Sequence, residues 1–411
     1  MVFFSANDFK TTSGGTIRMY GILNALAENG NQVIFISNAS DYSEFHPNIL
    51  HFPLNHPINA YSKRKFQFLL TYLPIELHNF YYRKLLEKCK SIFKPYKKTN
   101  VIFFEYLDNS IGYWLKQNQI IGGYINDIHG IASEEFQFQL HKEKNLKERV
   151  KIKFKIHTAK KLDQKVFENA AKLIVPAKAM RDYFINKYPA IKKINHIILP
   201  NVLSHPDDYI PPNPLISEKI STELQIQKSD FVLLFAGGFK KSSGILKLLH
   251  AFDVISQQHL NLRLIMIGDG PLMPEAQQFV HNSKLKDKVF FTGMTPYNEL
   301  HSYQDLSHLL ICPDDDNVFS HLIVHYKYLD ALLANKVVIN GNFKSVLEIN
   351  ENEILSLGYS PSSLESLIKT LNRAIENYPY YAEKYANTRS YILNCMTYKT
   401  QTKILESLYE N

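Results

Sequence analysis

FVLLFAGGFKKSSGILKLLHAFDVIS, residues 231–256, contains in one run the elements from which an α/β fold is built. FVLLF predicts a buried strand, a turn with two glycines follows, and GILKLLHAFDVIS predicts a helix. The same succession recurs downstream, where RLIMI, VFF, HLLIC and VVI are further apolar runs. Strands that alternate with helices predict a parallel sheet with helices on both faces.

The first half of the chain shows the same alternation. VFFSA, QVIFIS, VIFFE, YINDIH, KLIVPA and HIILPN are apolar runs separated by helical patterns. Between them and the second half, residues 202–228 are rich in Pro, Asp and Ser and predict a linker. The sequence therefore predicts two doubly wound, Rossmann-like α/β domains, 1–203 and 204–388.

Composition fits a soluble two-domain protein with an uneven charge. The chain has 411 residues, 45% hydrophobic and 21% charged. Residues 1–200 hold 29 Lys+Arg and 16 Asp+Glu, a net charge of +13, whereas the remainder carries −5. Such asymmetry indicates an anionic partner for the first half, either nucleic acid, a membrane surface or an anionic glycan, or else a solvated basic face. No recognised RNA- or DNA-binding module accompanies the basic residues, so nucleic acid is not the predicted partner.

Compartment and metal content follow from what the sequence lacks. No run of 18 uncharged apolar residues predicts a transmembrane helix, and residues 1–10 lack the pattern of a signal peptide. The cysteines, Cys89, Cys312 and Cys395, are far apart, odd in number and without metal-binding spacing. We expect a cytoplasmic protein without a resident metal.

Glycines, lysines and a histidine follow the predicted strands. In open α/β sheets ligands bind beyond the carboxyl ends of strands. Glycine lets a backbone approach a ligand closely, and lysines with the free N–H groups of a helix start favour a diphosphate. A plain turn or an exposed side chain is the alternative at each position. The residues are Gly14, Gly15, His129, Gly237, Gly238, Lys240, Lys241, Gly270, Met294 and Thr295.

Asp330 interrupts the apolar face of a helix predicted within YKYLDALLANKVVING, residues 326–341. Tyr326, Leu329 and Leu333 have the spacing of a buried stripe, and Asp330 lies at its edge. An apolar side chain is usual there. The residue is therefore either an exposed helix acid or a ligand-binding group.

In order and spacing, these motifs resemble the retaining glycosyltransferases of family 4, which have the GT-B fold. The matching pieces are FAGGF, RLIMIGDGP, VFFTGM and KYLDALLANKVVI in the second half and SGGTIR, DIHG and ILPN in the first. The resemblance implies two Rossmann-like domains facing each other across a cleft, with residues 389–411 as a C-terminal helix crossing back to the first domain. It also implies sugar transfer from a nucleoside diphosphate sugar, such as a UDP-sugar, with retention and without a metal.

The resemblance assigns two catalytic residues. His129 would position the donor sugar, and Asp330 would bind the ribose hydroxyls, because a carboxylate accepts two hydroxyl donors at once. The other donor-binding residues that it implies are Gly14, Gly15, Gly237, Gly238, Lys240, Lys241, Gly270, Met294, Thr295, Ser320, His325 and Lys327.

Three positions depart from the family's pattern. Leu322 stands where the first acid of its E-x7-E pair is expected. Gly238 and Ser243 align with the Arg and Lys that clamp the diphosphate, so Lys240 or Lys241 would have to supply that charge. These departures point to an altered donor or to a partly degenerate enzyme.

Residues 61–98 and 141–161 interleave aromatic and basic side chains. Such a surface suits lipid headgroups, and a pair of solvated basic helices is the alternative. We expect a glycan or lipid-linked acceptor in cell-surface polysaccharide biosynthesis, with the first domain peripheral on the inner face of the cell membrane. The rival functions are a nucleotide-sugar epimerase of the same fold and a non-catalytic basic binding protein.

Overall fold

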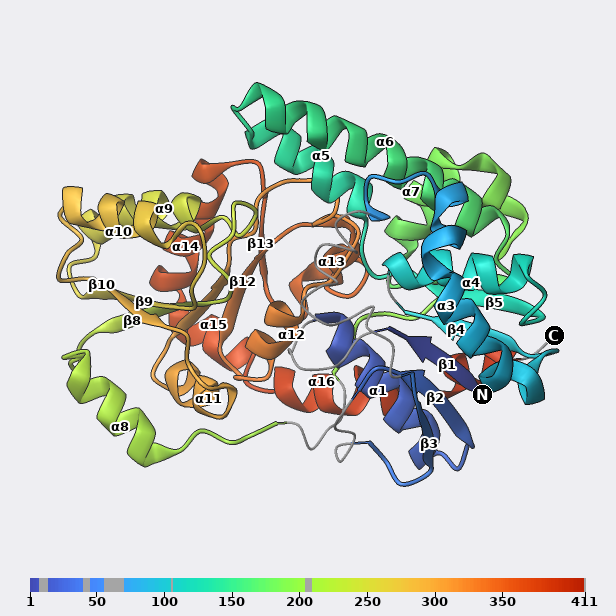
Figure 1. Cartoon of the computed structure of the whole chain (residues 1–411). Helices are drawn as coiled ribbons and strands as arrows, with labels where there is room; N and C mark the ends of the chain where they lie inside the picture. Colours follow the sequence, from blue (N-terminus) through green and yellow to red (C-terminus); the bar gives the residue numbers. More distant parts are fainter. Residues whose placement is uncertain (7–13, 40–44, 55–69, 105, 204–208, 410–411) are drawn as a thin grey trace. The chain divides into compact units, whose positions relative to one another are not determined.

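The computed structural model describes residues 1–6, 14–39, 45–54, 70–104, 106–203 and 209–409, which form two compact units (Figure 1). Unit 1 comprises Met1–His205 and Thr397–Asn411, and unit 2 comprises Pro206–Met396.

The sheet of unit 1 has seven strands in the order β3-β2-β1-β4-β5-β6-β7, and every neighbouring pair is parallel. Its central strands consist largely of buried apolar residues, because both faces are covered by helices. The strands are β1 Val2–Ser5, β2 Val33–Ser37, β3 Ile49–Pro53, β4 Asn100–Phe103, β5 Gly123–Asp127, β6 Lys172–Val175 and β7 Asn195–Ile198. The helices are α1 Gly14–Glu28, α3 Ile75–Phe93, α4 Tyr106–Gln117, α5 Ala132–Lys142, α6 Leu146–Glu168 and α7 Lys178–Lys187, with 3-10 turns η2 Lys94–Tyr96 and η3 Pro189–Lys193.

The sheet of unit 2 has six parallel strands in the order β10-β9-β8-β11-β12-β13. The strands are β8 Phe231–Ala236, β9 Leu262–Ile267, β10 Val289–Gly293, β11 Leu309–Cys312, β12 Val337–Gly341 and β13 Leu357–Tyr359. The helices are α8 Pro214–Glu223, α9 Ile245–Gln258, α10 Met273–Asn282, α11 Tyr297–Asp305, α12 Tyr326–Leu332, α13 Lys344–Leu347, α14 Leu364–Glu376, α15 Tyr378–Lys384 and α16 Thr388–Cys395, with the 3-10 turn η5 Glu351–Glu353.

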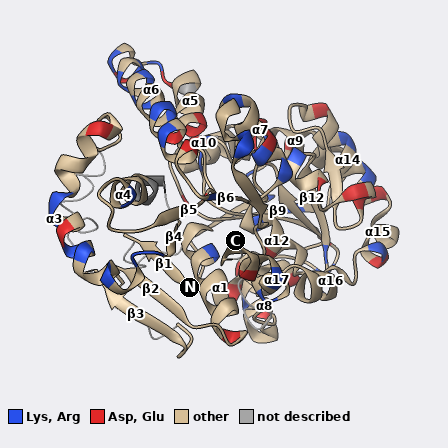
Figure 2. Ribbon diagram, turned by 90° about the vertical axis from the view of Figure 1, so that its right-hand side faces the viewer, with Lys and Arg blue, Asp and Glu red and all other residues tan. Residues whose placement is uncertain are grey.

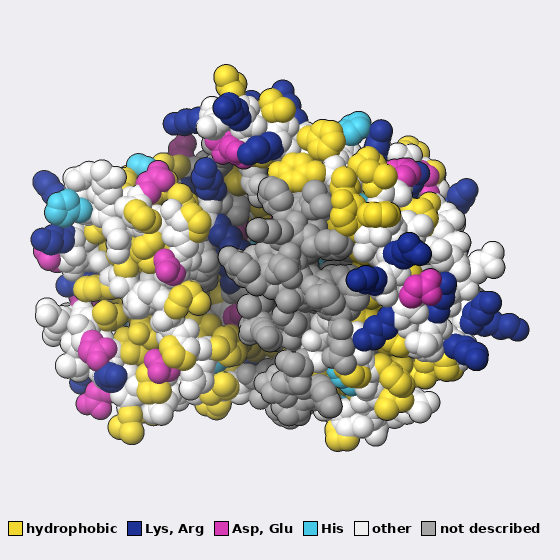
Figure 3. Space-filling model, in the orientation of Figure 1, with side chains coloured by type: hydrophobic (Ala, Val, Ile, Leu, Met, Phe, Trp, Pro, Cys, Tyr) yellow, Lys and Arg dark blue, Asp and Glu magenta, His cyan; other side chains and the backbone are white. Residues whose placement is uncertain are grey.

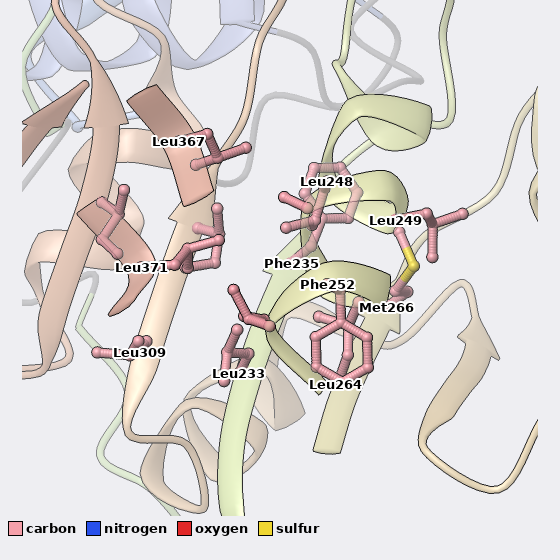
Figure 4. Close-up of a cluster of buried hydrophobic side chains, with 14 of the residues drawn as sticks. Leu233, Phe235, Leu248, Leu249, Phe252, Leu264, Met266, Leu309, Leu367 and Leu371 are labelled. Carbon is pink, nitrogen blue, oxygen red and sulfur yellow. The ribbon is translucent and has the colours of Figure 1, made fainter. Parts of the chain in front are cut away.

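One apolar cluster joins the sheet of unit 2 to α9, α10 and α14. Figure 4 shows Phe252 of α9 and Leu371 of α14 among side chains of the strands, such as Leu233. The opposite face carries α12, which contacts β11, β12 and α16. The predicted α/β architecture, with two doubly wound parallel sheets, is confirmed.

The strand orders fix where a ligand would bind. In each sheet the order reverses direction once, between β1 and β4 in unit 1 and between β8 and β11 in unit 2. Chains leaving the carboxyl ends of such a strand pair run to opposite faces and open a crevice. The loops after β8 and β11 are therefore the place to look for a site in unit 2.

The predicted linker, residues 202–228, contains helix α8, which the prediction missed. The Asn213 side chain accepts a hydrogen bond from the Leu215 N–H and caps this helix, while Pro214 occupies its first turn. Proline is compatible with that position, so a Pro-rich stretch can still start a helix.

The predicted single helix over residues 389–411 is wrong. Helix α16 ends at Cys395 and belongs to unit 2, whereas η6 Tyr398–Gln401, α17 Thr402–Glu406 and η7 Ser407–Tyr409 belong to unit 1. Thr397 between them is extended, bridges to Leu203, and closes a capping box with Thr400. These local bonds start a new helical turn in place of continuing the old one.

No helix in the described part of the chain is both long enough and apolar enough to span a bilayer.

Gly244 and Gly293 provide a matched pair of substitutions. Both have positive φ, +64° and +71°, but a β-carbon at Gly244 would lie 1.7 Å from the Pro313 carbonyl oxygen, while one at Gly293 would meet nothing within 4 Å. We expect Gly293→Ala to lower the free energy of unfolding by about 1–2 kcal/mol through backbone strain, and Gly244→Ala by about 2–5 kcal/mol because overpacking is added. Denaturant unfolding of both variants measures the difference. Equal losses would contradict the close loop packing.

Candidate functional site at the glycine loop of unit 2

The loop after β8 is bonded to the loops that follow β9 and β10. The Gly237 N–H donates to the Ile267 carbonyl at 3.0 Å, and the Gly268 N–H donates to the Gly293 carbonyl at 2.8 Å. A β-carbon at Gly268 would lie 2.0 Å from the Gly237 carbonyl oxygen. The buried Phe239 anchors the loop from beneath. Glycines thus bring three strand ends together at the carboxyl edge of the sheet.

Gly270 is part of the same packing. A β-carbon at this position would lie 2.7 Å from the Phe239 carbonyl oxygen, and the Gly270 N–H donates to Asp269 Oδ1 at 2.6 Å. Met294, by contrast, is 77% exposed, and the Thr295 hydroxyl lies 3.4 Å from that of Thr292. The structure therefore gives Gly270 a packing role and leaves the Met294 side chain open to solvent.

The two positions that align with the family's diphosphate clamp are bonded to each other. The Ser243 hydroxyl donates to the Gly238 carbonyl at 2.6 Å and closes the turn between them. Lys240 and Lys241 lie inside this turn and are exposed. Because Ser243 is buried and occupied with loop closure, these lysines are the cations that the loop itself supplies.

Lys327 of α12 is brought to the glycine loop. Its Nζ lies 2.6 Å from Asp314 Oδ1, and its stem passes along the loop, with Cδ 3.4 Å from the place of a Gly237 β-carbon. Its ammonium also lies 5.6 Å from the centre of the Phe235 ring. Asp314 and Lys327 both follow β11, and the stem of Lys327 brings this pair against the loop after β8.

Ser320 and His325 carry polar atoms that have no hydrogen-bond partner in the described part of the chain. Ser320 Oγ is buried with no bond, although the Ser320 N–H donates to Asn317 Oδ1 at 2.9 Å. His325 Nε2 is likewise buried and unbonded. Burial lowers the pKa of His325; Asp314 opposes this effect, and Lys327 and Lys240 reinforce it. The imidazole therefore sits among the charged groups of the loop and has a nitrogen free for a further bond.

Asp330 lies one turn further along α12 and is half-buried. Its Oδ1 accepts the Tyr297 hydroxyl at 3.1 Å. Burial raises the pKa of Asp330 to about 7, and the Tyr297 hydrogen bond only partly opposes that rise. Leu322, in the position of the missing acid, is a buried apolar residue at 4% exposure. Asp330 is therefore the carboxylate that α12 offers to a ligand.

Unit 1 contains the remaining predicted residues. Gly14 and Gly15 begin α1, and His129 follows β5. The structure adds a network that the sequence prediction did not include, in which the fully buried Arg18 binds the Asp127 carboxylate through two hydrogen bonds of 2.6 and 2.7 Å. The signal available in the sequence was an acid two residues before the histidine.

No group of three or more His, Cys, Asp or Glu side chains among the described residues is arranged to hold a metal ion. The three adjacent aspartates after β11 take up different contacts: Asp314 pairs with Lys327, and Asp316 lies 2.7 Å from His321 Nε2.

Residues 216–391 match the family model of the glycosyl transferases group 1. This range includes the glycine loop, Lys327 and Asp330, so the sequence resemblance is confirmed over the unit that carries them.

A curated relative covers part of the chain. The lipopolysaccharide 1,2-N-acetylglucosaminetransferase of Salmonella typhimurium is 25% identical over 235 residues, which are 54% of this chain and 58% of that enzyme. The chain spans less than two thirds of the length of the curated relatives it matches.

Solved structures share the whole fold. Sucrose-phosphate synthase from Thermosynechococcus elongatus gives a TM-score of 0.73 at 16% identity, over 99% of this chain and 96% of that one. HepE of Anabaena, in complex with UDP, gives 0.68 at 15% identity, over 99% and 98%. These likenesses establish the fold, which is GT-B.

The raised pKa of Asp330 makes stability depend on pH. Between the ordinary value of about 3.9 and the folded value of about 7, the folded chain binds a proton that the unfolded chain has lost. Raising the pH through this window therefore removes stability from the wild type. Asp330→Asn lacks the group, so we expect its stability relative to wild type to increase from pH 4 to pH 7.

The measurement is the melting temperature of wild type and of Asp330→Asn at several pH values from 4 to 7. Glu275→Asn, which changes an exposed acid in the first turn of α10, is the control. A constant difference between wild type and Asp330→Asn would contradict the assignment.

Proposed function

We propose that the chain is a glycosyltransferase that moves a sugar from a nucleoside diphosphate sugar to a glycan or lipid-linked acceptor in glycoconjugate biosynthesis. The observation that carries the proposal is the glycine loop of unit 2, where two exposed lysines, the Lys327–Asp314 pair and Asp330 occupy one strand edge within a segment matching the glycosyl transferases group 1. The UDP in the HepE structure makes uridine the first base to test.

Different residues of unit 2 bind different parts of the donor. Departure of the diphosphate builds negative charge, which Lys240, Lys241 and the loop N–H groups stabilise, together with the N-terminus of the 14-residue helix α9. Asp330, once ionised, accepts the ribose hydroxyls. His325 and Ser320 offer their unbonded polar atoms to the phosphates. No metal is needed for this charge balance, because the lysines supply it.

On the sugar side, His129 of unit 1 hydrogen-bonds a sugar hydroxyl and holds the ring. The ring develops oxocarbenium character as the bond to the diphosphate breaks. Following the family resemblance, the acceptor attacks the face of the ring that the diphosphate leaves, so the configuration is retained, and the leaving phosphate takes the acceptor proton. Gly14 and Gly15, at the start of α1, let the backbone approach the ligand.

Nucleotide binding tests the donor site directly. We expect UDP or GDP to raise the melting temperature of wild type, since a ligand at a hundred times its Kd adds roughly 2.7 kcal/mol. Asp330→Ala removes charge-assisted hydrogen bonds and should weaken that nucleotide about 10- to 100-fold. Lys240→Ala/Lys241→Ala should also weaken it, and Lys284→Ala/Lys286→Ala, two exposed lysines of the same unit, should not.

Incubating the protein with its preferred UDP- or GDP-sugar and no acceptor distinguishes a transferase from an epimerase. An epimerase converts the sugar into its epimer, whereas a transferase at most hydrolyses the donor. Absence of any nucleotide response would overturn the proposal and favour a non-catalytic basic binding protein.

Unit 1 docks on an anionic membrane surface through α6. Leu146, Val150 and Phe154 follow each other at intervals of four and are 78%, 67% and 51% exposed. They lie on the face opposite to Ile152 and Ile156, which pack against α5. Basic residues recur along α6 in Figure 2, and hydrophobic and basic side chains share the α5–α6 end of unit 1 in Figure 3.

Charge and apolar stripe act together at this surface. Residues 141–161 hold nine Lys+Arg and two Asp+Glu. Helix α3 adds the exposed Leu77 and Phe80, at 49% and 76%, and Tyr72 stacks on Phe154 with ring centres 6.4 Å apart. Residues 61–69 of the basic stretch 61–98 lie outside the described residues. An apolar stripe between lysines suits insertion at the headgroup boundary of an anionic bilayer.

Vesicle cosedimentation tests the docking surface. Leu146→Ser/Val150→Ser/Phe154→Ser should lower partition onto vesicles of phosphatidylcholine and phosphatidylglycerol at least tenfold, because each side chain is worth up to about 1.5–3 kcal/mol when buried. Lys147→Ala/Lys151→Ala/Lys153→Ala should lower it about 100-fold at low salt only, at about 1 kcal/mol per lysine. Leu215→Ser/Leu260→Ser is the control, since these residues of unit 2 are 75% and 78% exposed. Unchanged partition of the α6 variants would leave only a solvated basic helix.

A further inference from the structure

The carboxyl end of β5 holds a buried ion pair in which each nitrogen of the guanidinium makes a hydrogen bond. Arg18 of α1 is fully buried, and its Nε and Nη2 donate to Asp127 Oδ2 and Oδ1 at 2.6 and 2.7 Å. Its Nη1 donates to Asn201 Oδ1 at 3.1 Å, to the Tyr398 hydroxyl at 3.2 Å and to the Pro200 carbonyl at 3.3 Å. This pair of parallel hydrogen bonds, a guanidinium fork, fixes the plane of the carboxylate and also stabilises its negative charge.

Asp127 is ionised in this setting. Burial alone would raise its pKa, but the Arg18 guanidinium outweighs burial and His129 adds to it, so the pKa lies below its usual value. The carboxylate is therefore a charged acceptor held in one orientation, and its Oδ2 faces a second group besides Arg18.

That second group is the imidazole of His129. Its Nδ1 lies 3.5 Å from Asp127 Oδ2, and the side chain is 19% exposed. Nδ1 is a buried atom that makes no hydrogen bond to the described residues, and the Asp127 carboxylate lies beside it. A shift of a few tenths of an ångström turns the contact into a hydrogen bond, as active-site bonds tighten on binding.

We propose that Asp127 is the positioning residue of His129 and that Arg18 holds the carboxylate for this purpose. The inference rests on the proposed function only in that His129 is to contact the donor sugar. Nδ1–H donates to Asp127, which leaves the Nε2 lone pair to accept a sugar hydroxyl. The histidine is thus kept in one tautomer and one ring orientation, as a carboxylate does for an imidazole in other sites.

The C-terminal segment takes part in this arrangement. Tyr398 is fully buried, and its N–H donates to the Leu203 carbonyl at 3.0 Å. Its hydroxyl then accepts from Arg18, with the guanidinium carbon 6.0 Å from the ring centre. The residues after α16 therefore supply an acceptor to the cation that fixes Asp127, which gives this tail a role beside the histidine.

The tautomer of His129 tests the inference without any ligand. In full-length protein labelled with 15N-histidine, the imidazole signals of His129 are identified by their loss in His129→Gln. We expect the neutral Nδ1–H form in wild type. The double variant Arg18→Met/Asp127→Asn removes both charges, so that neither is left buried without its partner. In this variant we expect the Nε2–H form of His129 and an unchanged thermal unfolding curve.

Asp127→Asn alone leaves Arg18 buried without its partner and serves to measure folding. If the double variant also unfolds, the wild-type tautomer decides by itself: Nδ1–H supports the inference and Nε2–H overturns it.

Turnover of UDP-glucose adds a second readout. Arg18→Met/Asp127→Asn and His129→Gln should each lower it by a similar factor, and their combination should lower it no further, because both remove the same interaction. UDP affinity should stay within twofold, since UDP is assigned to unit 2. Additive losses would overturn the inference. If UDP-glucose is not consumed at all while His129 keeps Nδ1–H, the proposed donor fails and the positioning of His129 by Asp127 stands.

Discussion

Close packing of loop backbones is the constraint on which the rest of unit 2 depends. A β-carbon at Gly244 would lie 1.7 Å from the Pro313 carbonyl oxygen, and one at Gly268 would lie 2.0 Å from that of Gly237. Only glycine permits such approaches, so the loops after β8, β9 and β11 can share one edge. Groups that follow different strands then become neighbours, and the stem of Lys327, after β11, lies against Gly237, after β8. The close approach of glycine backbones therefore brings the Lys327–Asp314 ion pair next to the loop after β8.

Two carboxylates show how their surroundings decide their charge. Asp127 faces a cation at 2.6 Å, and the Arg18 fork holds its pKa low although the group is buried. Asp330 accepts the Tyr297 hydroxyl, and burial raises its pKa to about 7. A group that titrates near neutrality without a cation is one whose charge a ligand can still stabilise.

The sequence predicted the repeating architecture because parallel strands covered on both faces are continuous apolar runs, as FVLLF is. It also placed Lys327 and Asp330 on one short helix. It missed α8, since Pro214 reads as a loop residue until Asn213 is seen to cap the helix. It could not find the partners of Arg18, because Asp127 and Tyr398 lie 109 and 380 residues away and only folding brings them together. Helices and strands can be predicted because their apolar residues recur with a fixed period along the sequence. Polar pairs between distant residues leave no such periodic pattern.

The positive charge left for a ligand at the glycine loop depends on which pairs have already formed. Lys327 is engaged with Asp314, so that pair contributes little net field. Lys240 and Lys241 lie exposed on a turn closed by the 2.6 Å bond from Ser243 to the Gly238 carbonyl. Long exposed side chains lose rotamer entropy when a bound diphosphate orders them. Exposed charges are also screened by salt. Under the proposed function, such a turn favours a diphosphate that is bound weakly in the ground state and released readily once the sugar has left.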